Sequence, residues 1–80
     1  MKIIGTINPF ILNQRFSVYD DDNNLIENFE LSFEEFDKNI DEYIKKYNIN
    51  SINLIGNHQF TKGLIKNTEK RQPKVKFTFL

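Results

Sequence analysis

Hydrophobic residues recur with two different periods along this 80-residue chain. A period of two is typical of a strand with one buried face, and a period of about 3.6 is typical of an amphipathic helix. A short apolar run between turn residues is typical of a buried strand. Together these patterns predict strands over residues 2–7, 11–19, 25–31, 51–55 and 74–80 and helices over residues 33–47 and 58–68.

A polar turn separates the second and third predicted strands. Residues 20–24 are Asp-Asp-Asp-Asn-Asn, whose side chains bond their own backbone and tolerate a positive φ. Phe16 and Val18 share one face of the strand before this turn, and Leu25 resumes the alternation after it. The pattern therefore predicts a β-hairpin over residues 11–31.

The first helix has the clearest local signals in the chain. Ser32 is a suitable N-cap, Glu35 follows three residues later to close a capping box, and Leu31 and Phe36 are spaced for a hydrophobic staple. Asn48 is suited to end the helix in the left-handed conformation. Six apolar residues lie between these ends at helical spacing, namely Phe33, Phe36, Ile40, Tyr43, Ile44 and Tyr47.

The second half of the chain predicts a buried strand and a weaker helix. Residues 51–55 are short, apolar and bounded by Asn50 and Gly56, which indicates a strand buried on both faces. The following helix is predicted to turn Phe60 and Leu64 inward. Gly63 weakens it by about 1 kcal/mol relative to alanine.

The chain is predicted to end in a strand. Residues 69–73 contain Pro73 and are predicted to form a loop. Val75, Phe77 and Phe79 then share one face of the last strand. These aromatic residues more often fill a core than stack on nucleic-acid bases.

The element order is β-β-β-α-β-α-β, which predicts one small α/β domain over residues 1–80. Chains divide into several cores only above roughly 250 residues. The N-terminal hairpin requires antiparallel pairing, whereas strands joined through a helix are parallel and connected by right-handed crossovers. We therefore expect a mixed sheet.

One local string resembles a known family. Residues 3–10 are Ile-Ile-Gly-Thr-Ile-Asn-Pro-Phe and precede a hairpin, which is similar to the opening of RuvC-like members of the ribonuclease H-like superfamily. The family has a metal-binding aspartate where this chain has Asn8, and the family motif has one residue fewer between its glycine and that aspartate. The family also has a second acid where this chain has Gly56-Asn57. Two-metal cleavage needs anionic ligands. The resemblance therefore implies a degenerate member that does not cleave nucleic acid.

Composition excludes several classes of chemistry. The chain has no cysteine, so it has no disulfide, thiolate nucleophile or cysteine-ligated metal. The run Asp20-x-Asp22-x-Asn24 begins like a calcium loop, but Leu25 occupies the position of the required glycine. We expect no cofactor and no metal. No apolar run is long enough for a membrane span or a secretory signal, so we expect a cytoplasmic protein without a membrane partner.

Charge is sorted along the chain although it sums to zero. Residues 20–42 carry ten acidic side chains against Lys38 alone, and residues 62–80 carry six basic side chains against Glu69. We predict a small non-enzymatic interaction protein that binds a basic protein partner, by analogy with accessory or inhibitory factors of phages and mobile elements. The predicted acidic docking strip comprises Asp21, Asp22, Glu34, Asp37 and Asp41.

Three alternatives remain open. A nucleic-acid-binding module would use the basic side chains Lys66, Lys70, Arg71, Lys74 and Lys76. A small ligand-binding or hydrolytic domain would use a crevice at the strand ends formed by Thr6, Asn8, Asn57 and His58. Self-association would use the open edge of the final strand.

Overall fold

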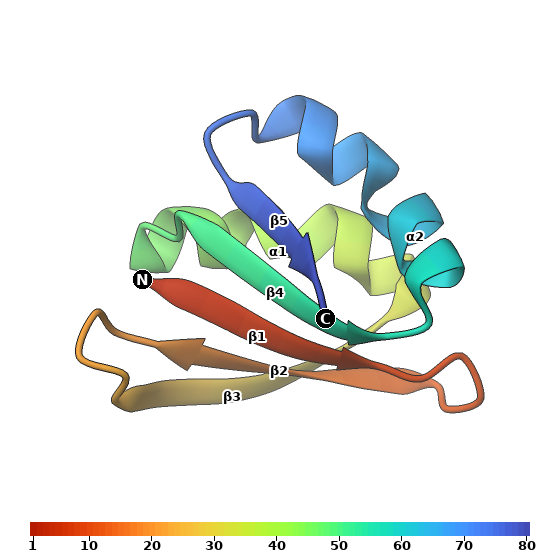
Figure 1. The fold of residues 1–80 in the computed structure, drawn as a ribbon, viewed down its shortest axis with the longest axis horizontal. Helices are drawn as coiled ribbons and strands as arrows, with labels where there is room; N and C mark the ends of the chain where they lie inside the picture. The colour runs from red at the N-terminus through yellow and green to blue at the C-terminus, as the bar shows by residue number, and fades with distance from the viewer.

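A computed structural model describes the backbone of residues 1–80 and every side chain except that of His58. It confirms the predicted α/β class and the element order (Figure 1). The Cα radius of gyration is 11.5 Å. The elements are β1 (Lys2–Ile7), β2 (Asn13–Tyr19), β3 (Leu25–Ser32), α1 (Phe33–Tyr47), β4 (Ser51–Gly56), α2 (His58–Arg71) and β5 (Lys76–Phe79).

The five strands form one mixed sheet in the order β3-β2-β1-β4-β5. The pairs β1–β2 and β2–β3 are antiparallel, and the pairs β1–β4 and β4–β5 are parallel. The turn between β2 and β3 places Asn23 at a φ of 64°, as the Asp-Asn cluster predicts. The predicted hairpin and mixed sheet are confirmed.

Both helices cover the same face of the sheet. The crossover from β3 to β4 and the crossover from β4 to β5 run in the same direction across the sheet, so equal handedness puts both helices on one side. The buried cluster agrees, because it joins Ile3 and Ile52 of the sheet to Ile40 of α1 and Ile65 of α2. The opposite face of the sheet has no helix over it (Figure 1).

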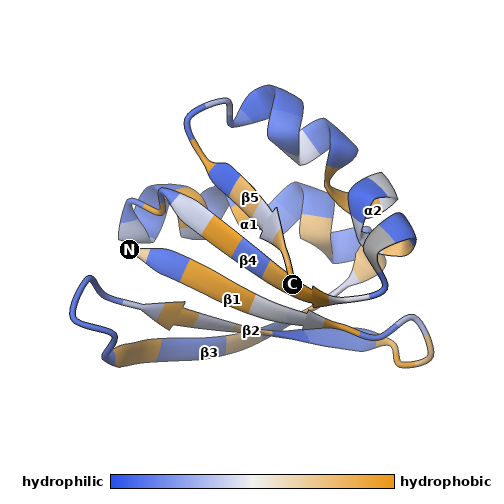
Figure 2. Cartoon of the chain, viewed as in Figure 1, coloured by the Kyte–Doolittle hydropathy of each residue, from blue (hydrophilic) through white to orange (hydrophobic). Residues whose placement is uncertain are grey.

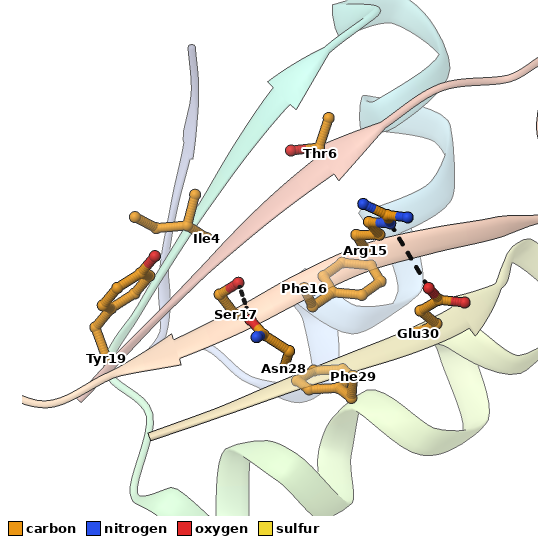
Figure 3. A pocket seen from close by; sticks show the side chains of 9 residues that line it. All are labelled: Ile4, Thr6, Arg15, Phe16, Ser17, Tyr19, Asn28, Phe29 and Glu30. Carbon is orange, nitrogen blue, oxygen red and sulfur yellow. Dashed lines mark hydrogen bonds and ion pairs between the residues drawn. The ribbon is translucent and has the colours of Figure 1, made fainter. Parts of the chain in front are cut away.

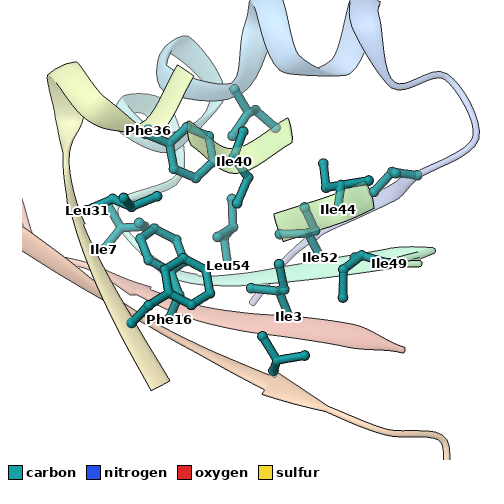
Figure 4. Close-up of a cluster of buried hydrophobic side chains, with 14 residues drawn as sticks. Ile3, Ile7, Phe16, Leu31, Phe36, Ile40, Ile44, Ile49, Ile52 and Leu54 are labelled. Atoms are coloured by element: carbon teal, nitrogen blue, oxygen red, sulfur yellow. The ribbon is translucent and has the colours of Figure 1, made fainter. Parts of the chain in front are cut away.

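The core lies between this covered face and the helices (Figure 4). The ring of Phe16 lies 5.2 Å from that of Phe29 and 5.5 Å from that of Phe36, measured between centroids. Gly5 makes room for this packing, because a Cβ at that position would come within 2.7 Å of Phe16 Cδ1 and 2.8 Å of Leu54 Cδ2. The Phe16 ring therefore fits in the core only because Gly5 has no side chain.

The predicted capping of α1 is confirmed at both ends. Ser32 Oγ accepts from the Glu35 amide, and a Glu35 carboxylate oxygen accepts from the Ser32 amide. The hydrogen bond from the Ser32 amide, and after it the Ser32 side chain, lowers the pKa of Glu35 below its ordinary value. At the other end Asn48 adopts the left-handed conformation with a φ of 52°.

Two predicted boundaries are wrong near the termini of strands. The second strand begins at Asn13 rather than at residue 11, because Ile11 contributes its carbonyl to Gln14 in the preceding loop. The final strand begins at Lys76 rather than at 74, because the Val75 amide donates to Gln72 in a turn. Ladder pairing starts only when the Lys76 amide donates to Asn50.

The second helix differs from the prediction in length and in buried face. It continues to Arg71, so residues 69–71 are not loop, because tertiary contacts of Thr68 and Arg71 with α1 hold the last turn. Leu64 is half-buried and packs against the core as predicted, whereas Phe60 is exposed, so the prediction is wrong for Phe60 alone. The buried side chains of α2 are Thr61, Ile65 and Thr68.

Strand β4 is buried on one face only, which corrects the prediction of burial on both. Ile52 and Leu54 are buried, whereas Asn53 is half-buried and Ile55 is exposed. Its apolar run resembles that of a strand between two layers. Because both helices lie on the same side, the second layer is missing.

Candidate binding surface

The bare face of the sheet carries the side chains that alternate with the core. The strand registers align them in three rows across the sheet. The middle row places Ile4 among short hydrogen-bonding side chains, namely Ser17, Asn28, Asn53 and Thr78. The outer rows are Tyr19, Lys2, Ser51 and Lys76 at one end and Glu30, Arg15, Thr6 and Ile55 at the other.

A hollow of about 550 Å³ lies on this face over β1, β2 and β3 (Figure 3). Half-buried Ile4 and Tyr19 supply its apolar outward side chains. Its polar outward side chains are Thr6, Arg15, Ser17, Asn28 and Glu30. The volume falls in the range of ligand sites, which is about 300–1,000 Å³.

Two polar contacts cross the hollow between β2 and β3, as the dashed lines of Figure 3 mark. Ser17 Oγ donates to Asn28 Oδ1 at 2.6 Å. Arg15 Nε lies 3.6 Å from Glu30 Oε1, and both side chains are largely exposed. An exposed pair of this kind contributes little to stability, so its groups are available to a ligand at small cost.

The polar and apolar groups of the hollow are suited to contact a ligand. The Ser17 hydroxyl donates to an amide oxygen, which is not a base, so the hollow does not activate it as a nucleophile. Its amide, hydroxyl and charged groups can bond a polypeptide backbone or polar side chains, while Ile4 and Tyr19 offer apolar contact. The surface has the mixed composition of a non-obligate protein interface.

The structure divides the predicted acidic strip among separate places. Asp21 and Asp22 lie in the β2–β3 turn, whereas Glu34 lies in the first turn of α1, at the other end of the eight-residue strand β3. Eight strand residues span about 26 Å. The Asp21 carboxylate also lies 3.4 Å from the N-terminal ammonium group. These residues therefore do not form one continuous patch.

Asp37 and Asp41 bond to a basic residue of α2. Arg71 Nη1 donates to Asp37 Oδ1 at 2.9 Å, and Arg71 Nε donates to Asp41 Oδ2 at 2.8 Å. The hydrogen bonds that Arg71 donates to Asp41 and then to Asp37 raise the pKa of Arg71 above its ordinary value. Opposite charges that lie far apart in the sequence thus neutralise each other here and tie the two helices together.

Other acidic groups lie in the edge strand β3 and in the turn before it. Asp20 closes the β2–β3 turn by accepting from the amides of Asn24 and Asp22, and the bond from Asn24 is the main cause of its lowered pKa. Glu27 and Glu30 belong to the edge strand β3. Asp22 and Glu30 thus flank the bare face on the β3 side, whereas Glu27 lies on the covered side, where it accepts from the Tyr47 hydroxyl and lies 4.0 Å from Lys46 Nζ.

The predicted basic residues gather around the opposite edge. Lys66 and Lys70 lie on α2, Lys74 lies in the loop after it, and Lys76 begins the edge strand β5. None of these four lysines forms an ion pair with any side chain that the structure describes. Arg71 is separated from them by its bonds to α1.

The strand-end crevice is formed only in part. Parallel pairing sets Thr6 beside Ile55 at the ends of β1 and β4. However, Asn8 Oδ1 accepts from the Phe10 amide, and Asn57 Oδ1 caps α2 by accepting from the Phe60 amide. These oxygens bond their own backbone, and Thr6 lines the sheet hollow instead. The His58 side chain lies outside the described residues.

Sequence reasoning missed the bare-face residues Ile4, Ser17, Tyr19 and Asn28. Their signal was the alternate set of positions in each predicted strand, which face away from Phe16 and Phe29. The alternation does not predict on which side of the sheet each helix packs.

Other features of the described residues add no chemistry to this surface. No group of three metal-ligating side chains occurs among them. No helix in the described part of the chain is long and apolar enough to cross a bilayer. Comparison of the chain with protein-family models, with curated protein sequences and with solved structures gives no match.

Proposed function

We propose that this chain is a small non-enzymatic interaction protein whose bare sheet face binds a basic segment of a protein partner. The observation that carries the proposal is the uncovered face with its hollow over β1, β2 and β3. The parallel pairs β1–β4 and β4–β5 belong to a kind of sheet that is normally covered on both faces, and the hollow lies over the antiparallel pairs beside them. A partner laid across this face would supply the second layer and bury Ile4 and Tyr19.

The charge around the hollow supports a basic partner. Asp22 in the β2–β3 turn and Glu30 on β3 lie on this side of the face, and Glu30 has an arginine beside it, at Arg15. Acidic residues at the rim of an interface steer a basic partner and raise its association rate. The docking surface is therefore the β3 side of the bare face, and Asp37 and Asp41 are not part of it.

The fold supports a ribonuclease H-like relationship as part of the same proposal. The element order, the strand order β3-β2-β1-β4-β5 and the antiparallel β2 fit the resemblance carried by residues 3–10. Asn8 serves the loop in place of a metal-binding acid. On this proposal the protein is a degenerate member that acts by occupancy in the cytoplasm, as an accessory or inhibitory factor would.

The test compares two variants that add the same side chain to opposite sides of the molecule. Ser17→Arg fills the hollow, whereas Asn67→Arg changes an exposed residue of α2 on the covered side. The partner is captured from the native host after nuclease treatment, purified, and titrated against each variant at two salt concentrations. We expect Ser17→Arg to weaken binding at least tenfold, about 1.4 kcal/mol, and Asn67→Arg to leave it unchanged.

Higher salt should slow association with the wild-type chain, because the rim of the hollow is acidic. Equal binding by the two arginine variants would place the interface elsewhere. Loss of the captured partner on nuclease treatment would favour nucleic acid instead.

A nucleic-acid-binding function is the second candidate. It is favoured by Lys66, Lys70, Lys74 and Lys76, which lie around one edge without ion pairs to described side chains. It predicts retention on an oligonucleotide at low salt and a log–log salt slope that falls when Lys66→Glu and Lys70→Glu are combined. Absence of retention at 50 mM salt would exclude this candidate.

A further inference from the structure

The end of the molecule at which β1 and β4 finish carries unusual apolar exposure. Phe10 is 93% exposed and Leu12 is 77% exposed, both in the loop between β1 and β2. Ile11 of the same loop, Ile55 at the end of β4 and Phe60 at the start of α2 are also exposed. Figure 2 shows the apolar loop at the right of the molecule, beside the end of β4. We call these five residues the apolar end.

This loop is held rigidly from beneath. Gln14 is 1% exposed, and its Nε2 donates to the carbonyls of Asn8 and Ile11, both at 2.9 Å. Gln14 Oε1 accepts from the Asn8 amide, and Asn8 Oδ1 accepts from the Phe10 amide at 2.9 Å. The loop therefore displays Phe10 in a fixed backbone conformation, which reduces the entropy lost on binding.

Apolar residues at the tip of a hydrogen-bonded loop do not serve the core. Loop tips are normally polar, and exposed apolar clusters of this kind mark interaction sites. The buried cluster of the domain contains none of the five residues. Phe60 also packs on Phe33, with 4.5 Å between the ring centroids, whereas Phe10 and Leu12 remain largely exposed, so a partner that covered them would bury apolar surface.

We propose that the apolar end is a self-association surface on which two copies of this chain pack about a twofold axis. Two observations select a second copy as the occupant. The five side chains offer about 500 Å² per copy, given about 150–250 Å² for each large aromatic residue, so two copies bury about 1,000 Å² before the polar rim is counted. That area reaches the lower limit for a specific interface.

Charge supplies the second observation. The charged residues of the bare face nearest this end, Arg15 and Glu30, are paired with each other, and the whole chain has no net charge. A twofold contact that reaches this pair therefore adds no unpaired charge from the bare face. This surface is distinct from the final-strand edge, where β5 offers only four residues.

The test measures the oligomeric state of the full chain by sedimentation equilibrium from 1 to 200 µM. Phe10→Asp places a charge in the apolar end. Leu25→Asp is the matched control, because Leu25 is 54% exposed and begins β3 at the opposite end of the sheet. We expect a concentration-dependent dimer for the wild type and for Leu25→Asp, and at least a tenfold higher dissociation constant for Phe10→Asp.

A cross-linking experiment keeps the proposal testable even if Phe10→Asp fails to fold. The chain has no cysteine, so a single cysteine introduced by substitution is the only site at which a thiol-reactive cross-linker can join two copies. A short bifunctional maleimide should link Asn13→Cys, beside the loop, much faster than Asp22→Cys in the far turn. A monomer at 200 µM, a dimer that Phe10→Asp does not weaken, or equal linking of the two cysteines would each overturn the proposal.

Discussion

The two faces of the sheet are built from the same strands, but one packs against the helices and the other is exposed to solvent. On the covered face, Ile3, Phe16, Ile52 and Leu54 are almost completely buried under two helices. On the bare face, the neighbours of these residues are Ile4, Ser17, Asn53 and Ile55, which remain in contact with solvent. The domain is stabilised by one face only, which leaves the other free for binding.

Substitutions on the two faces are therefore expected to lower the free energy of unfolding by different amounts. A change on the covered face alters close packing, so its cost rises with the volume removed or added. A change on the bare face alters contacts with water, so its effect on folding is small, and under the proposed function its effect on binding is large. The predictions below use pairs of positions that separate these two cases.

The largest effect is expected for Phe16→Ala. Phe16 packs between Phe29 and Phe36, and removal of its ring should lower the free energy of unfolding by about 3–5 kcal/mol. Thr6→Ala on the bare face should change it by less than about 0.5 kcal/mol. Urea unfolding of both variants checks the comparison, and similar losses would show that both faces are packed.

Gly5→Ala is expected to have the next largest effect. Its Cβ would come within 2.7 Å of the Phe16 ring, so we expect a loss of about 1–3 kcal/mol. A Cβ at Gly63 in α2 would meet no atom within 4 Å, so Gly63→Ala should instead stabilise by about 0.5–1 kcal/mol. Thermal melts measure whether each variant is more or less stable than the wild type. Destabilisation by Gly63→Ala would contradict the finding that a Cβ at Gly63 has open space.

A smaller loss is expected for Arg71→Ala, which removes the link between the helices above the covered face. The charged groups are more than one third exposed, so screening limits the loss to about 1 kcal/mol. Arg15→Ala removes the looser pair on the bare face and should cost less than about 0.5 kcal/mol. A double-mutant cycle of Arg71→Ala with Asp41→Ala measures the coupling energy between the two side chains. A coupling energy of zero would refute the link between the helices.

The smallest effect is expected from acid. Glu35 has a lowered pKa in the folded chain, so its contribution is present above its unfolded pKa and is lost as pH falls through the folded value. Melting temperature should therefore decline from about pH 5 towards pH 3. Glu35→Gln keeps an acceptor for the Ser32 amide but does not titrate, so its decline should be shallower. Identical pH profiles would remove the capping box as a cause.

Local sequence signals predicted most of the elements. The capping box of Ser32 and Glu35, the stop at Asn48 and the turn at residues 20–24 depend on hydrogen bonds within a few residues. Such bonds form in the same way in any compact fold. Signals of this range therefore gave correct positions for α1 and for the β2–β3 hairpin.

Boundaries failed where a distant contact extends or shortens an element. Arg71 extends α2 because it reaches Asp37 and Asp41 of α1. Ile11 and Leu12 have the apolar character of a strand, but Gln14 draws the preceding backbone into a loop. Neither contact has a local sequence signature. Ile11 and Leu12 were therefore assigned to a strand.

The candidate surfaces were also decided by tertiary structure. The sequence placed acidic residues in one segment, but β3 separates Asp22 from Glu34, and folding brings Arg71 to Asp37. Alternation determined which residues share a face of each strand. It could not determine which face the helices cover, because that depends on the order and direction of the crossovers.

The sequence by itself therefore determined the class of the fold, the element order, the capped helix and the lack of cysteine chemistry. These follow from periodicity, capping and composition, which act within a few residues. The tertiary structure alone decided that one sheet face is bare, that Arg71 joins the two helices and that Phe10 is displayed on a rigid loop. These features depend on contacts between distant segments, whose pairing no local pattern records.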